Sequence, residues 1–272
     1  MTADIQEILC CPVCKCSLTE ELICTNCRRI YSLVDGIYVM IDPATSQKKW
    51  KWDPTIFTEE KMTKVTTEYN SYINEETKTA QKIWWDKMDM YLTDFHGVVV
   101  DIATGLGGLF EKLMKSNSNF SPIATDIDPN VLFWTTKRLQ KMCVKELFGV
   151  ATDAKYLAFK NNTADYITSC SGFSNIPHVE LAFQEVYRIL KKNGKLVFMH
   201  SFFDENSSST TLAKQQCIGI FIEKNLKAVL KHVGFNNIRS EIVASATWAK
   251  NPMDILPMAG DRQYYAVVYA VK

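Results

Sequence analysis

The sequence predicts a doubly wound α/β sheet that follows a small cysteine-rich unit. Two observations support this fold class. Strand-like and helix-like segments alternate from about residue 96 onward, and six of the nine cysteines fall within the first 27 residues. The chain has 272 residues, 47% of them hydrophobic, which suits one large domain and one small one. We expect the small unit at residues 1–41, a linker and N-terminal helices that cover the functional site at 42–95, and the α/β domain at 96–272.

The N-terminal cysteines include two C-x-x-C pairs, a spacing typical of structural zinc sites. Such a short segment buries little core, so metal binding would contribute much of its folding energy. We favour zinc over two disulfides. Cys10 and Cys16 stand beside the pairs and are alternative ligands, but the C-x-x-C spacing argues against them. The predicted ligands are Cys11, Cys14, Cys24 and Cys27.

The segment after these pairs resembles a known ribbon. Residues 31–40 read Y-S-L-V-D-G-I-Y-V-M and are similar to the tail of zinc ribbons of the tRNA-methyltransferase-activator type. Ser32 and Tyr38 stand where those ribbons carry proline. Such a ribbon also precedes certain methyltransferases, including 23S rRNA guanine methyltransferases. The resemblance implies a ribbon that binds RNA or a protein partner, or that only stabilises the chain.

Residues 42–60 read as a linker with lysines at Lys48, Lys49 and Lys51, and residues 59–95 have helical composition with many aromatic side chains. The net charge of the whole chain is only +1, which gives no general attraction to nucleic acid. No segment resembles a signal peptide or a membrane span, so we expect a cytoplasmic protein without membrane contact.

A buried strand, a glycine-rich turn and a helix start follow one another at residues 98–110. The β-branched run at 98–100 suits a parallel strand covered on both faces. Gly105, Gly107 and Gly108 allow the backbone to approach a ligand closely, and the helix start presents free N–H groups. A dinucleotide fingerprint fits poorly, because its third glycine would fall on Phe110. The turn alone therefore indicates a nucleotide-like ligand without identifying it.

Acidic residues end the next two strands. Asp126 closes a predicted strand at 122–126 and lies 21 residues after Gly105, close to the spacing at which an acid meets a ribose. Asp128 precedes Pro129 and is expected to cap the next helix. Asp153 follows a predicted strand at 147–152. It is either a ligand contact or an ordinary turn aspartate.

The remaining pattern continues the alternation. A strand is predicted at 164–170, a helix at 178–190, a strand at 195–200, a helix at 212–233, and strands at 237–247 and 263–271.

This ordered set resembles class I S-adenosylmethionine-dependent methyltransferases over residues 60 to 272. Their D-x-G-x-G-x-G loop stands here as Asp101, Ala103, Gly105 and Gly107, with Ala103 replacing the first glycine. The resemblance implies a Rossmann-like, seven-stranded methyltransferase sheet. It also implies that Asp126 bonds the ribose of S-adenosylmethionine. The expected cofactor-binding residues are Asp101, Ala103, Thr104, Gly105, Gly107, Asp126, Ile127, Asp153, Ala154, Cys170 and Ser171.

The resemblance also implies an enzyme that holds an acceptor in line with the sulfonium methyl group. The near-neutral charge and the aromatic N-terminal helices favour a small-molecule acceptor. The ribbon and the linker lysines favour RNA, and a non-catalytic cofactor-binding partner protein is a third possibility. Candidate general bases are His178, His200 and Asp204, near the carboxyl ends of two strands. For His178 and His200 the alternatives are a helix cap and a core residue.

Overall fold

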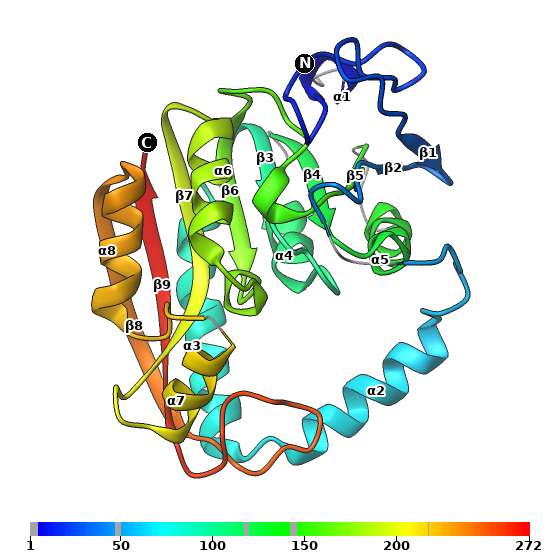
Figure 1. Ribbon diagram of the computed structural model, residues 1–272. Helices are drawn as coiled ribbons and strands as arrows, with labels where there is room; N and C mark the ends of the chain where they lie inside the picture. The colour runs from blue at the N-terminus through cyan, green and yellow to red at the C-terminus, as the bar shows by residue number, and fades with distance from the viewer. Residues whose placement is uncertain (1–4, 47–49, 117–119, 142–145, 217) are drawn as a thin grey trace.

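Nine strands form one mixed sheet in the part of the chain that the structure describes (Figure 1). The computed structural model describes residues 5–46, 50–116, 120–141, 146–216 and 218–272. The strand order is β1-β2-β5-β4-β3-β6-β7-β9-β8. The strands are β1 (Ser32–Val34), β2 (Ile37–Val39), β3 (Gly97–Asp101), β4 (Phe120–Asp126), β5 (Phe148–Ala151), β6 (Ala164–Cys170), β7 (Leu190–Phe203), β8 (Asn236–Thr247) and β9 (Arg262–Val271).

Strands β5, β4, β3, β6 and β7 are parallel, and β9 and β8 close the sheet as an antiparallel pair beside β7. These seven strands confirm the predicted methyltransferase-type sheet. The helices are α1 (Ile5–Ile8), α2 (Glu59–Tyr72), α3 (Glu75–Leu92), α4 (Gly108–Ser116), α5 (Pro129–Gln140), α6 (Val179–Ile189), α7 (Ser208–Gln215) and α8 (Glu223–Val233), with 3₁₀ turns η1 (Ala154–Tyr156) and η2 (Phe173–Asn175).

Helices cover both faces of the sheet. Successive side chains of a strand point to opposite faces, so an apolar strand needs a covering layer on each side. Val98 and Val100 pack into one hydrophobic cluster with α6 and α8, and the side chains of the cysteine-rich segment join the same cluster. Val99 points the other way and packs with α3, α4 and α5. The two clusters explain why residues 98–100 of β3 are all apolar, since a central parallel strand is buried on both sides.

The N-terminal segment adds two strands to the edge of the sheet. Strand β2 runs parallel to β5, with Ile37 opposite Gly149 and Val39 opposite Ala151. A Cβ atom on Gly149 would lie 2.5 Å from Ile37 Cδ1, so this close approach depends on glycine. Sequence patterns did not predict this pairing. The expected boundaries at residues 41 and 95 remain predictions.

The predicted helix at 212–233 is wrong in one respect, because the chain forms two helices there. Between α7 and α8 the residues Ile218, Ile220 and Phe221 are buried. The backbone carbonyl of Ile220 accepts a hydrogen bond from His200, and that of Phe221 accepts one from the amide of Phe203. In a continuous helix these carbonyls would accept hydrogen bonds from amides of the same helix. Here they accept from residues of β7 instead, so the helix is interrupted.

The strand predicted at 195–200 is longer in the structure. Leu190 already pairs with Ala164, and the register shifts before Tyr166 pairs with Lys195. Two linker lysines, Lys48 and Lys49, lie outside the described residues. None of the described helices has the length and apolar character needed to cross a membrane.

Candidate functional site

The glycine-rich turn connects β3 to α4 and rests on the end of β4. The amide of Gly105 donates a hydrogen bond of 2.9 Å to Asp126 Oδ2. Ala103, Gly105 and Gly107 all have positive φ, at +51°, +52° and +75°. Alanine at the first of these positions is strained, because a Cβ atom disfavours the left-handed region. The turn thus adopts a left-handed conformation at Ala103, although class I methyltransferases carry glycine at this position.

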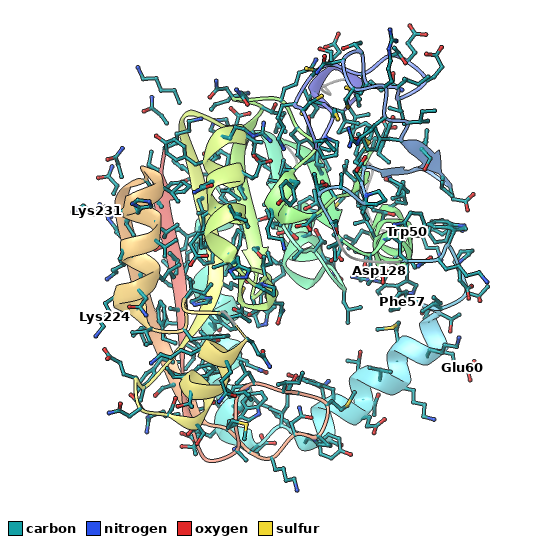
Figure 2. The ribbon with its side chains drawn as sticks, in the orientation of Figure 1. Trp50, Phe57, Glu60, Asp128, Lys224 and Lys231 are labelled. Atoms are coloured by element: carbon teal, nitrogen blue, oxygen red, sulfur yellow. The ribbon has the colours of Figure 1, made fainter. Side chains whose placement is uncertain are left out.

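Asp126 points both of its carboxylate oxygens at backbone amides. Oδ2 accepts from Gly105, and Oδ1 accepts from the amide of Asp128 at 3.0 Å. Burial raises the pKa of Asp126, while these N–H donors lower it. Asp128 caps α5 by accepting from the amide of Asn130, as expected, and is labelled in Figure 2.

A narrow cleft of about 130 Å³ opens beside this carboxylate at the carboxyl ends of β4 and β5. Open α/β sheets bind ligands at this edge. Asp153 caps η1, where its Oδ1 accepts a hydrogen bond from the amide of Lys155, and it also lines the cleft, so a ligand contact at Asp153 stays a prediction. The cleft is lined by Ala103, Thr125, Asp126, Ile127, Thr152, Asp153, Ala154, Lys155, Asn175, Ile176 and Pro177.

Asp101 lies deeper than the cleft and is only 2% exposed. Its Oδ1 accepts a 2.6 Å hydrogen bond from the hydroxyl of Thr168 on β6. Burial raises the pKa of Asp101 to about 6, which the Thr168 hydroxyl partly offsets. Burial likewise raises the pKa of the nearby Cys170 thiol to about 12, and the Asp101 charge adds to this effect. The raised pKa keeps Cys170 in its thiol form at neutral pH.

The cleft brings together five of the eleven predicted cofactor residues: Ala103, Asp126, Ile127, Asp153 and Ala154. Thr104, Gly105 and Gly107 instead form the turn, and the Thr104 hydroxyl donates to the Asp101 carbonyl. Asp101 and Cys170 are not among the residues that line the cleft, whereas Ser171 lines a second, larger cavity.

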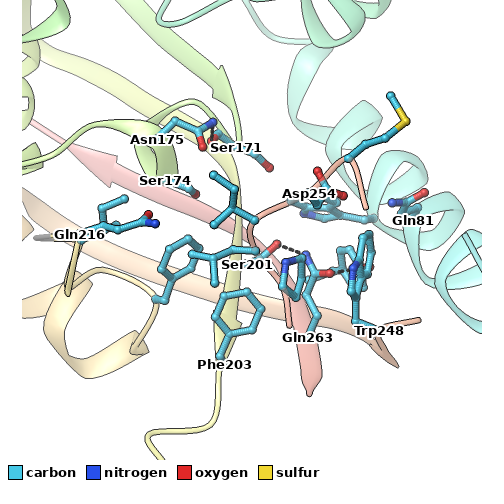
Figure 3. Close-up of a pocket in the computed structure, with 18 of the residues that line it drawn as sticks. Gln81, Ser171, Ser174, Asn175, Ser201, Phe203, Gln216, Trp248, Asp254 and Gln263 are labelled. Carbon is cyan, nitrogen blue, oxygen red and sulfur yellow. Dashed lines mark hydrogen bonds between the residues drawn. The ribbon is translucent and has the colours of Figure 1, made fainter. Parts of the chain in front are cut away.

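Figure 3 shows a second cavity, which has a volume of about 650 Å³. Asn175 and Pro177 line both spaces. Its wall draws on α2, α3, β7, β9 and the segment between β8 and β9. The lining residues are Tyr69, Gln81, Trp84, Ser171, Ser174, Asn175, Pro177, Ser201, Phe203, Gln216, Ile218, Phe221, Trp248, Met253, Asp254, Ile255, Leu256, Pro257, Gln263 and Tyr265.

Neutral polar groups are fixed on one side of the cavity. Gln263 donates to the Ser201 hydroxyl at 2.6 Å, and the Tyr265 hydroxyl donates to Gln263 Oε1 at 2.9 Å. Figure 3 shows Ser201 and Gln263 joined in this way. The Trp84 indole donates to the Ala266 carbonyl at 2.7 Å. The indole nitrogen of Trp248 is buried without a partner among the described residues. The sequence led us to expect the N-terminal helices and Ser171 at the site, and α2, α3 and Ser171 do line this cavity, whereas the residues from β7, β9 and the segment between β8 and β9 were not predicted.

The three candidate general bases lie outside the cavity lining. His200 is fully buried, its Nε2–H donates to the Ile220 carbonyl, and its Nδ1 lies 3.2 Å from the Ser174 hydroxyl. Burial lowers the pKa of His200 to about 4, so the ring is neutral at neutral pH. Because Nε2 carries the proton, Nδ1 accepts from Ser174, which does line the cavity. His178 is exposed and does not cap α6 with its side chain, and Asp204 accepts from the Tyr264 hydroxyl.

The four predicted zinc ligands gather at one point, with all their sulfur atoms within 4.8 Å of one another. The Sγ atoms of Cys14 and Cys24 lie 3.3 Å apart, and those of Cys11 and Cys27 lie 3.6 Å apart. Zinc–sulfur bonds of about 2.3 Å at tetrahedral angles place sulfurs about 3.8 Å apart, so the set fits a structural zinc ion. Cys10 lies outside this set, and burial raises its pKa to about 11.

Two regions of the chain match known families. Residues 57–217 match the ubiE/COQ5 methyltransferase family, and residues 4–36 match the Trm112p-like proteins. The ubiquinone/menaquinone biosynthesis C-methyltransferases UbiE of Rickettsia prowazekii and of Bartonella henselae are each 30% identical to this chain over 121 residues. That alignment covers 43% of this chain, and 49% and 46% of those proteins. The chain thus spans about half the length of these relatives.

Solved structures share the fold. Phosphoethanolamine N-methyltransferase 2 of Haemonchus contortus superposes with a TM-score of 0.54 at 17% identity, over 76% of this chain and 56% of that one. A putative methyltransferase of Bacillus halodurans gives 0.54 at 15% identity, over 68% and 97%. These likenesses confirm the predicted α/β sheet, and the Trm112p-like match confirms the predicted ribbon. Because the ubiE/COQ5 match spans more than half of its residues, the chain belongs to the ubiE/COQ5 methyltransferase family.

Proposed function

We propose that this protein transfers a methyl group from S-adenosylmethionine to a small-molecule acceptor. The observation that carries the proposal is the junction of two spaces. The cleft beside Asp126 and the larger cavity share Asn175 and Pro177. A methyl donor in the first space and an acceptor in the second would meet at this junction. Family membership supports the same reaction, since the named relatives are C-methyltransferases.

The residues of the chain would act mainly by binding and positioning. Asp126 would accept hydrogen bonds from the ribose hydroxyls, and Ile127 and Ala154 would pack against the adenine. Asp101 lies beneath the turn and outside the cleft lining, and its negative charge there would favour the methionyl ammonium group. S-adenosylmethionine supplies an already activated sulfonium methyl group. The protein therefore needs to hold the acceptor in line with the C–S bond and to exclude water.

His200 is our choice among the three candidate bases for a role at the acceptor. Its Nδ1 accepts from Ser174, so the Ser174 oxygen is left to accept a hydrogen bond from the cavity side. The lowered pKa of His200 favours orienting the Ser174 hydroxyl over holding a proton. His178 and Asp204 remain proposed general bases, and neither residue lines the cavity.

The cavity also favours a small molecule over RNA. No lysine or arginine occurs among the described residues that line it, and an RNA site depends on such groups. RNA is the alternative acceptor, and the Trm112p-like ribbon is the observation that favours it. We also propose that the ribbon contacts a protein partner and that the protein works in the cytoplasm. A reducing compartment would keep its zinc-binding thiols available.

Titration calorimetry with S-adenosylmethionine tests the proposed cofactor cleft. Asp126→Ala should weaken binding by about 100-fold, because hydrogen bonds to a charged group contribute about 1.5–3 kcal/mol each. Asp128→Asn is the matched control. It changes a nearby carboxylate but keeps a good helix cap, so its affinity should stay near that of the wild type. Equal affinity of Asp126→Ala and the wild type would refute the proposed ribose contact.

A further inference from the structure

The acceptor cavity contains a single carboxylate. Asp254 lies in the segment between β8 and β9. It is the one acidic side chain among the described residues that line the cavity (Figure 3). That lining contains no lysine, arginine or histidine among its described members. The fixed charge that a bound molecule meets there is therefore negative.

This carboxylate has polar neighbours but no cationic partner. Asn251 Nδ2 donates to Asp254 Oδ2 at 3.1 Å, and Tyr69 of α2 lines the same cavity near this carboxyl group. No ion pair within the described part of the chain involves Asp254. Partial burial raises the pKa of Asp254, and the Tyr69 hydroxyl lowers it. A half-buried carboxylate without a counter-ion is incompletely solvated, so a cation bound beside it would gain a favourable charge interaction.

The rest of the wall is suited to the same kind of ligand. Aromatic rings present electronegative faces, which attract cations as well as flat apolar groups. The ring contact between Trp84 and Tyr265, with centroids 5.1 Å apart, fixes two of these faces. Hydrogen bonds to Ala266 and Gln263 hold the same two side chains. The aromatic lining residues are Tyr69, Trp84, Phe203, Phe221, Trp248 and Tyr265.

We propose that the cavity takes a cationic organic acceptor, an amine with an aromatic or apolar body, and that Asp254 is its counter-ion. This inference rests on the proposed methyltransferase function and deepens it by assigning the charge class of the acceptor. The ammonium group would pair with Asp254, and the body of the molecule would lie among the rings. An anionic acceptor would meet repulsion and no compensating cation. Asp254 is thus a specificity-determining residue.

Three indole compounds that differ in charge test the inference: tryptamine, tryptophol and indole-3-propionate. Calorimetry is performed on full-length protein saturated with S-adenosylhomocysteine, so that the cofactor cleft is filled. The wild type should bind tryptamine at least about tenfold more tightly than tryptophol and should bind indole-3-propionate most weakly. Asp254→Asn should remove the preference for tryptamine over tryptophol. Asp254→Glu keeps the charge and should retain the preference.

Asp86→Asn is the matched control, because it removes a carboxylate that is exposed on α3 and paired with Lys82. Its preferences should equal those of the wild type. Equal binding of the three compounds, or no measurable tryptamine binding by the saturated protein, would overturn the inference. So would an unchanged preference in Asp254→Asn. If S-adenosylhomocysteine itself failed to bind, the proposed function would fall first, and this inference with it. The affinity for S-adenosylhomocysteine in Asp254→Asn also verifies that the variant is folded.

Discussion

Replacing Asp101 with asparagine should stabilise the ligand-free protein and impair its response to S-adenosylmethionine. Asp101 is buried beneath the glycine turn, where its charged form is poorly solvated. Asparagine has nearly the same shape and still accepts the hydrogen bond from Thr168. The substitution removes the buried charge but also the group that would neutralise the methionyl ammonium.

The pKa of Asp101 sets the size of the effect. Its rise from 3.8 to about 6 corresponds to about 3 kcal/mol, at about 1.4 kcal/mol per pKa unit. Between these two values the folded protein holds a proton that the unfolded chain has lost, so stability falls as pH rises through this window. Above pH 6 the penalty is complete, and below 3.8 it is absent. The new amide N–H groups need acceptors, so we expect a net gain of about 1–3 kcal/mol at neutral pH.

Thermal unfolding at pH 7.5 and at pH 4, with and without S-adenosylmethionine, measures both effects. Asp101→Asn should raise the midpoint at pH 7.5 by roughly 2–4 °C for each kcal/mol, and this advantage should shrink at pH 4. Added S-adenosylmethionine should raise the midpoint of the wild type more than that of the variant. Thr168→Val, which leaves the carboxylate without its hydroxyl donor, should lower the midpoint. A less stable Asp101→Asn at pH 7.5, or an undiminished ligand response, would refute the reasoning.

Three further predictions concern the turn, the zinc site and the buried histidine. Gly107→Ala should cost about 1–3 kcal/mol in thermal unfolding, because its Cβ would lie 2.6 Å from Thr135 Cγ2. Gly260→Ala has the same left-handed backbone but open space, so an equal loss there would contradict the steric argument. Plasma emission spectroscopy should find about one zinc per chain. Cys24→Ser should lose this zinc and lower the thermal unfolding midpoint. Full retention of the metal by this variant would contradict the assignment of Cys24 as a ligand. The neutral His200 should make stability fall as pH drops from 6.5 toward 4, because the unfolded chain binds the proton first. Denaturant titrations of His200→Asn should show a shallower loss over this range, and an identical slope would count against the buried neutral ring.

Much of the fold, and part of the proposed cofactor cleft, could be predicted from local sequence patterns. The β-branched run of β3 indicates a covered parallel strand, and the glycine turn that follows it is recognisable because few residue types tolerate positive φ. The spacing from Gly105 to Asp126 is local to one strand–helix–strand unit, and the two residues are hydrogen-bonded. The two C-x-x-C pairs predict a zinc site directly, since this spacing is typical of four thiolates that bind one structural zinc ion.

The features that sequence reasoning missed depend on contacts between distant segments. The pairing of β2 with β5 brings residues 37–39 beside residues 149–151, and only the glycine at 149 hints at such an approach. The break between α7 and α8 arises from bonds to β7, which helical periodicity does not reveal. The larger cavity, our proposed acceptor site, adds residues from β7, β9 and the segment between β8 and β9 to those of the expected N-terminal helices. Asp254 stands in that irregular segment, where no pattern singles it out.

We propose that the protein transfers a methyl group from S-adenosylmethionine in the cleft to a small molecule in the larger cavity. Purified protein incubated with S-adenosylmethionine carrying a tritiated methyl group tests it, with a metabolite filtrate and total RNA as separate acceptor pools. We expect label in the small-molecule pool, together with S-adenosylhomocysteine, and loss of both in Asp126→Ala. Label confined to RNA would contradict the proposed acceptor. Binding of S-adenosylmethionine without transfer to either pool would contradict the proposed catalysis.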